Sequence, residues 1–152
     1  MEPLLSLSLR KGLFFNFVQK NKMNYNSIEE VELDTSLIYN FEEYIYSSNH
    51  DINMKGQTNY FKMKEKLWQL DSNSIQIQGA LDILDSYFED ISFKQFEKEE
   101  DVLRHRLLVE FSDYYGGQEG RFKMSAKKDR DIQKALDMLH DSVVFENVLL
   151  PQ

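Results

Sequence analysis

The chain contains no cysteine among its 152 residues. Disulfide bonds, thiol chemistry and cysteine-based zinc sites are therefore excluded, although the absence fits both a cytoplasmic and a periplasmic protein. Breakers of regular structure are also scarce, because the chain has only 2 prolines and 6 glycines. Long side chains with few breakers favour helices over a turn-rich β architecture.

The sequence also lacks a long hydrophobic run. Its apolar stretches are only a few residues long, whereas a membrane-spanning helix needs about 20. The leucines between Leu4 and Leu9 are interrupted by serines and are followed, rather than preceded, by basic residues, which is not the pattern of a signal peptide. We therefore expect no membrane insertion, and any export signal of a longer parent would lie upstream.

Positive charge is in deficit, with 18 basic and 26 acidic residues and a formal net charge of −8. A nucleic-acid-binding protein needs the opposite balance to release counterions from phosphates, so we expect no nucleic-acid partner. One basic cluster interrupts the acidic background. We interpret it as solvating a connecting loop, with an acidic partner or a peptide carboxylate as the alternative. Its members are Arg121, Lys123, Lys127, Lys128 and Arg130.

Catalytic and metal-binding motifs are missing from the sequence. The three histidines, at positions 50, 105 and 140, never have the i, i+4 spacing of a zinc motif. Ser-x-x-Lys occurs at Ser8 and again at Ser125, without the partner motifs that give this pattern meaning. The acidic run from Glu97 to Asp101 is interpreted as a solvated helix face rather than an acid/base pair or calcium site. We expect no catalytic residue, no metal and no cofactor.

Hydrophobic residues recur at spacings of three and four along most of the chain, which predicts amphipathic helices. The expected fold is all-α, an irregular bundle of about six helices in a single domain over residues 1–152. Alternation at residues 5–9 leaves a strand open there, Gly12 weakens the first helix, Asp34 is expected to cap the second, and Ser92 is expected to cap or kink the chain. The helices are expected at 4–20, 34–48, 59–70, 77–91, 93–115 and about 129–139, with loops at 21–34 and 47–58.

The most informative segment lies near the carboxyl end. Tyr114 and Tyr115 are followed by three glycines within five residues, then by Arg121, and a short periodic helix follows from Asp129. Glycines permit a sharp helix end, and an aspartate is favourable at a helix start. We expect the chain to reverse at this point and to pack its last helix on the preceding one, so that Phe111 and Leu136 share one core.

This segment resembles one in the carboxyl-terminal processing, or tail-specific, serine proteases of the bacterial envelope. Their helical region ends with two aromatic residues, four further positions, Gly-Arg and an aspartate-led helix, as in 114–121 and 129–139 here. The segments 9–17 (LRKGLFFNF), 41–44 (FEEY) and 111–115 (FSDYY) are similar to three other parts of that region. The resemblance covers nearly all of residues 5–141, sparsely. The chain departs from the family in having Gly116 and Gly117 where bulkier residues are common.

The resemblance implies a non-catalytic C-terminal helical domain that scaffolds, gates or dimerises a parent serine endopeptidase in the cell envelope or periplasm. The protease core would be its partner, with a homodimer as a further expectation. Residues for the turn would be Tyr114, Tyr115, Gly120, Arg121 and Asp129, with Arg121 tying the turn to neighbouring oxygens. The serine/lysine pair, the PDZ-like module and the β-rich core of such enzymes are absent from the sequence. A free-standing acidic helical adaptor is the alternative.

Excision from a larger enzyme would leave apolar surface uncovered at the two ends of the chain. The expected sources are the first helix, around Leu5, Leu9 and Leu13, and the tail at Leu149 and Leu150. We expect these ends either to mediate self-association or to be disordered, while the part of the chain from Phe41 to Leu139 is ordered.

Overall fold

The computed structural model describes residues 4–47 and 56–140. This part of the chain contains helices and no strand, which confirms the expected all-α fold. None of its helices is both long and apolar enough to cross a membrane. The helices are α1 (Leu4–Arg10), α2 (Leu13–Asn21), the 3-10 turn η1 (Lys22–Asn24), α3 (Ile28–Leu33), α4 (Leu37–Ser47), α5 (Gln57–Leu70), α6 (Ile75–Ala126) and α7 (Arg130–His140).

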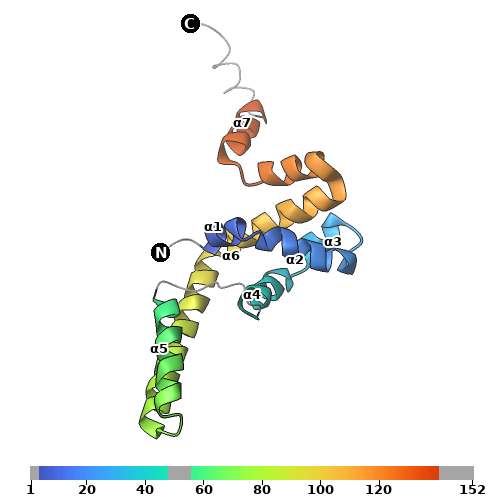
Figure 1. The fold of residues 1–152 in the computed structure, drawn as a ribbon. Coiled ribbons are helices and arrows are strands. Elements are labelled where there is room, and N and C mark those ends of the chain that lie inside the picture. Colours follow the sequence, from blue (N-terminus) through green and yellow to red (C-terminus); the bar gives the residue numbers. More distant parts are fainter. Residues whose placement is uncertain (1–3, 48–55, 141–152) are drawn as a thin grey trace, which may run out of the picture.

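Helix α6 is 52 residues long and organises the molecule. Helices α1 to α4 pack around its middle third to form what we call the body, while α5 lies along its first part to form a projecting arm (Figure 1). Helix α7 lies at the opposite end from the arm. We define the arm as α5 with residues 75–93 of α6, and the body as α1 to α4 with residues 96–111 of α6.

The body contains one hydrophobic core to which all of its helices contribute. Phe41 of α4 is fully buried and stacks on Phe14 of α2 with ring centroids 4.9 Å apart, while Phe17 meets it edge-on at 5.2 Å. Such aromatic contacts add to the large apolar area that each ring removes from water. The core residues are Leu4, Leu13, Phe14, Phe17, Val18, Val31, Leu37, Ile38, Phe41, Ile45, Phe96, Leu103, Leu107 and Phe111.

The expected first helix is divided in two. Gly12 has φ of 66° and ψ of 24°, a left-handed conformation that side chains with a Cβ rarely adopt. It ends α1 and lets α2 leave in a new direction, which buries Leu4 and Leu13 in the same core. The expectation of a first helix exposed through Leu13 was therefore wrong, although Leu9 remains 44% exposed. The other expected exposed end, at Leu149 and Leu150, lies outside the described residues.

The segment expected to be a loop over 21–34 contains η1 and α3. Ser27 is extended at the start of α3, and the carboxylate of Glu30 accepts a hydrogen bond from the Asn26 backbone N–H at 2.8 Å. A serine followed three residues later by glutamate is a known helix-start pattern that the long run of polar residues obscured. Asp34 ends α3 instead of capping the next helix, and its carboxylate accepts hydrogen bonds from Ser36.

Helix α6 is also longer than the sequence indicated. Ser92 was expected to cap or kink the chain, but its hydroxyl donates to the Phe88 carbonyl at 2.8 Å inside a continuous helix. A serine side chain can satisfy itself within its own helix in this way, so it did not act as a stop. The real interruption is Gly117, with φ of 57° and ψ of −151°, after which the chain is helical again to Ala126.

The acidic run at 97–101 is not solely a solvated face. The Glu99 carboxylate accepts hydrogen bonds from the backbone N–H groups of Leu4 and Leu5, at 2.9 and 2.8 Å. These are free donors at the start of α1, where a negative charge is also favoured by the helix dipole. Glu99 therefore fixes α1 against α6, a long-range role that no local pattern announces.

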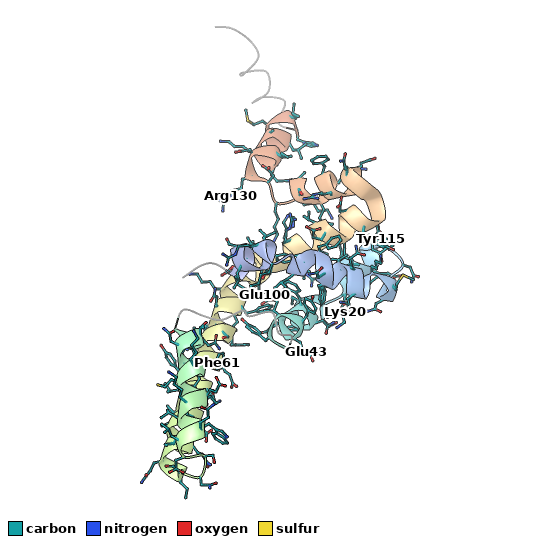
Figure 2. All side chains as sticks on the ribbon, viewed as in Figure 1. Lys20, Glu43, Phe61, Glu100, Tyr115 and Arg130 are labelled. Carbon is teal, nitrogen blue, oxygen red and sulfur yellow. The ribbon has the colours of Figure 1, made fainter. Side chains whose placement is uncertain are left out.

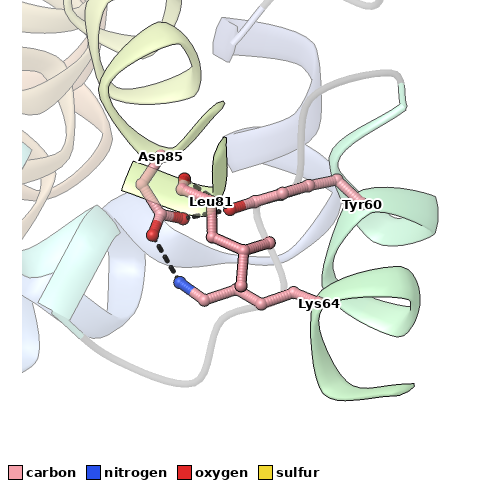
Figure 3. Close-up of polar contacts among 4 residues, drawn as sticks. All are labelled: Tyr60, Lys64, Leu81 and Asp85. Carbon is pink, nitrogen blue, oxygen red and sulfur yellow. Dashed lines mark hydrogen bonds and ion pairs between the residues drawn. The ribbon is translucent and has the colours of Figure 1, made fainter. Parts of the chain in front are cut away.

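The arm is held by a small buried cluster between its two helices (Figure 3). Tyr60 of α5 and Leu81 of α6 are its buried side chains, with exposed fractions of 5% and 3%. The Tyr60 hydroxyl lies 2.7 Å from an Asp85 oxygen and 3.1 Å from the Leu81 carbonyl, and Lys64 forms an ion pair with Asp85. The hydrogen bond from Lys64, together with that from Tyr60, holds the pKa of Asp85 below its usual range despite partial burial.

Candidate functional site at the carboxyl-terminal bend

The bend follows the aromatic pair at the end of the long stretch of α6. Gly117 turns the chain, and the segment after it returns over the segment before it (Figure 1). A Cβ placed on Gly120 would lie 2.5 Å from the Ser112 carbonyl oxygen, closer than real side chains approach backbone. Glycine is therefore required at this position for close packing of helix on helix.

The two tyrosines at the bend have different environments (Figure 2). Tyr115 is half-buried, and its hydroxyl lies 2.9 Å from the carbonyl oxygens of both Lys22 and Tyr25. Burial, and next the neighbouring Tyr114, raise the pKa of Tyr115. Tyr114 is 43% exposed and carries the Lys22 ammonium 4.9 Å from its ring centroid. Tyr115 thus ties the bend to η1 and the approach to α3, while Tyr114 remains accessible.

Arg121 pairs with Asp113 across the bend, with Nη1 and Oδ2 3.6 Å apart and both side chains partly exposed. An ion pair in this environment is worth about 1 kcal/mol or less. The expected contact of Arg121 with neighbouring oxygens therefore exists, as a modest tether. Backbone geometry at Gly117 and Gly120 makes the larger contribution to the shape of the bend.

The basic cluster lies mostly on helix instead of on the expected connecting loop, since α6 continues to Ala126. Several of its charges are used within the chain: Lys123 pairs with Glu119, Lys127 with Glu32, and the Lys128 ammonium donates to the Asp101 carbonyl. These contacts connect the end of α6 to α3 and to its own middle. The cluster thus contributes to the architecture of the bend.

Asp129 begins the last helix. Its Oδ1 accepts hydrogen bonds from the backbone N–H groups of Asp131 and Ile132, at 2.9 and 3.1 Å. These bonds satisfy two of the donors that every helix start leaves free. The Gln133 amide also donates to the Ala126 carbonyl at 2.9 Å, so the first turn of α7 is attached to the end of α6.

Helix α7 does not pack against the core. None of its residues is buried, and Leu136 is 41% exposed whereas Phe111 is 0% exposed. The expectation that Phe111 and Leu136 share one core was wrong. The bend directs the helix away from the body, and sequence periodicity cannot specify which neighbour covers an apolar stripe. Ile132 and Leu139, on the same stripe as Leu136, are 42% and 60% exposed.

A hollow of about 460 Å³ lies beside the bend, between α3 and the returning end of α6. Ile28, Tyr115, Gly120 and Met124 are among its lining residues. Within the described ranges no three histidine, aspartate or glutamate side chains come together as a metal site would require. Ser8, of the first Ser-x-x-Lys pattern, is buried in the helical core and Ser125, of the second, is exposed on α6.

Comparison with known families assigns this architecture. A family model described as the C-terminal helical domain of a probable PDZ-protease matches residues 5–139. This chain belongs to that family. The match covers the body, the arm, the bend and nearly all of α7. The chain is thus a non-catalytic helical part of a protease. No curated protein and no solved structure matches the chain significantly.

Proposed function

We propose that this chain is the docking scaffold of its parent peptidase, with α7 as the segment that contacts the protease core. Scaffolding, gating and dimerisation were the roles that the family resemblance implies. Scaffolding has the most direct support, because the body has a complete core of its own while α7 presents an uncovered apolar stripe.

The observation that carries the proposal is the pattern of α7 itself. Ile132, Leu136 and Leu139 lie along one face, and the polar residues Arg130 and Lys134 lie on the other. A short amphipathic helix gains most of its stability from burying such a stripe, since an isolated helix of this length is marginal in water. The fixed start at Asp129 presents the stripe in a defined direction, as a docking element requires.

The chemistry and the location of the parent also belong to this proposal. The likeness of the segments around Gly12 and Arg121 to tail-specific proteases supports a serine endopeptidase of the cell envelope or periplasm. In such an enzyme a helical domain attached to the core would hold the catalytic module in place while the module handles extended peptides. The catalytic groups themselves would be supplied by the core.

Binding between this chain and the separately produced protease core tests the proposal. Titration calorimetry should give saturable binding for the natural chain and its loss for Leu136→Glu, because a charge would replace the centre of the stripe. Lys134→Glu places the same acid on the opposite face of α7 and serves as the matched control, with binding retained. If the natural chain fails to bind the core, the docking role is refuted and the free-standing adaptor is favoured. Equal binding by Leu136→Glu would exclude α7 as the contact.

A further inference from the structure

The arm carries a second apolar face that α5 leaves open. Ile77, Ala80, Leu84, Tyr87 and Ile91 follow one another at alternating spacings of three and four, the heptad pattern of a coiled-coil seam. Helix α5 packs on a different side of α6, where Tyr60 meets Leu81 and Asp85. We call these five residues the seam.

The seam is accessible along the arm. Tyr87 is 57% exposed, and Ala80 is also exposed. Met63 and Leu67 of α5 flank it, and together with Ile77, Ala80 and Leu84 they line an apolar groove of about 400 Å³. Coiled-coil seams in water are stable when a second helix fills them.

The same register continues from the arm into the body. Lys94 and Lys98 take the next two heptad positions, beside a mostly apolar hollow of about 670 Å³ between α1 and α6. Leu5, Ile91 and Val102 supply the apolar lining of this hollow. It therefore combines an apolar floor with two ammonium groups, in a chain whose formal net charge is −8.

The tip of the arm has the complementary character. Leu70, at the end of α5, is 80% exposed, and the next residue is the exposed carboxylate of Asp71. Leu70 lies on the side of α5 that carries Met63 and Leu67, since their spacing is three and four residues. The tip thus presents an apolar side chain and an adjacent negative charge on the side of the groove.

The spacing of these features is self-complementary. About 24 residues of α6 separate the level of the tip from the centre of the hollow, which is about 36 Å at a rise of about 1.5 Å per residue. Leu84 lies midway. A two-fold axis through Leu84 would place the tip of each copy in the hollow of the other, with Ile77 opposite Ile91. Isologous interfaces of this kind use one patch twice.

We propose that a second copy of this chain packs antiparallel on the seam, with Asp71 of each tip beside Lys98 of the other copy. The paired arms form a four-helix bundle that covers the grooves of both copies. An unrelated helix would fill the groove without accounting for the tip and the hollow at equal distances from Leu84. This surface is distinct from the stripe of α7, so the inference does not depend on docking to a protease core.

Sedimentation equilibrium of the purified chain tests the pairing. A dimer is expected at micromolar concentrations, and Leu84→Glu should abolish it because two carboxylates would meet on the axis. Ser86→Glu adds the same charge on the outer side of α6, two residues away, and should leave the dimer intact. A monomeric natural chain overturns the proposal. So does a Leu84→Glu protein that still dimerises.

Charge exchange tests the orientation and does not depend on disrupting the apolar seam. Lys98→Asp and Asp71→Lys should each weaken the dimer about tenfold, since each places like charges together. The double variant restores opposite charges and should return to within about threefold of the natural affinity. Additive losses in the double variant would show that these residues do not meet, and would refute the antiparallel arrangement.

Discussion

The body and the arm are built from equally periodic helices, but they bury very different amounts of apolar surface. In the body α1, α2, α3 and α4 all pack on α6 and enclose one continuous core that includes Phe14, Phe41 and Phe111. In the arm α5 packs on α6 alone, and Tyr60 and Leu81 are its buried side chains. The body is a folded unit in its own right, whereas the arm is a two-helix extension whose outer faces remain open.

The comparison shows that periodicity reports a need for burial and does not report whether the need is met. The stripe of α7 and the seam of α6 have the same 3–4 spacing as the helices of the body, yet both remain accessible. Buried contacts set local stability, so the arm should open at lower free energy than the body. The partly open faces are therefore the places where partners are expected.

The largest expected effect separates the two cores. Phe111→Ala should destabilise the body by about 3–5 kcal/mol, through lost burial and a cavity, and lower the melting temperature by on the order of 10 °C. Leu81→Ala should mainly speed amide exchange in α5, because the arm can open while the body stays folded. Circular dichroism melts and hydrogen exchange followed by mass spectrometry measure the two effects. Equal shifts in melting temperature for both variants would mean that arm and body unfold as one unit.

A smaller effect is expected at the bend, which forms the edge of the body. Gly120→Ala should cost about 1–3 kcal/mol, since its Cβ would lie 2.5 Å from the Ser112 carbonyl oxygen and the helices would have to separate. Gly116→Ala meets nothing within 4 Å and should be neutral or stabilising by up to about 1 kcal/mol. Urea denaturation of the two variants supplies the measurement. A Gly120→Ala protein as stable as Gly116→Ala would contradict the close helix packing.

The smallest expected effect is an acid response confined to the arm. The folded pKa of Asp85 lies below its usual value because of Lys64 and Tyr60, so its contribution is present above about pH 4 and is lost as pH falls towards the folded pKa. Trp68, the single tryptophan, lies on α5 and reports on the arm. Its fluorescence should change below about pH 4 before the helical signal does. Asp85→Asn should flatten this early change, and identical titrations of the two proteins would count against the ion pair.

Much of the fold could be read from the sequence because it rests on local chemistry. The helical class, α4, α5 and the start of α7 follow from 3–4 spacing, scarce breakers and an aspartate at 129, which act within a few residues. The sequence also indicated the family through ordered motifs around Gly12 and Arg121, and a family model for the helical domain of a PDZ-protease matches residues 5–139. The assignment of the turn residues at the bend to a functional role stays a prediction.

The tertiary structure decided what no local pattern contains. The Glu99 carboxylate caps α1 from 95 residues away, Ser92 sits unbroken within α6, and Gly120 is needed only because Ser112 passes beside it. The direction in which Gly117 sends the chain left Leu136 uncovered, against expectation. Each outcome depends on which distant segment arrives at a given side chain. The sequence determined which residues must be buried, and only the packed chain determined which of them found a neighbour.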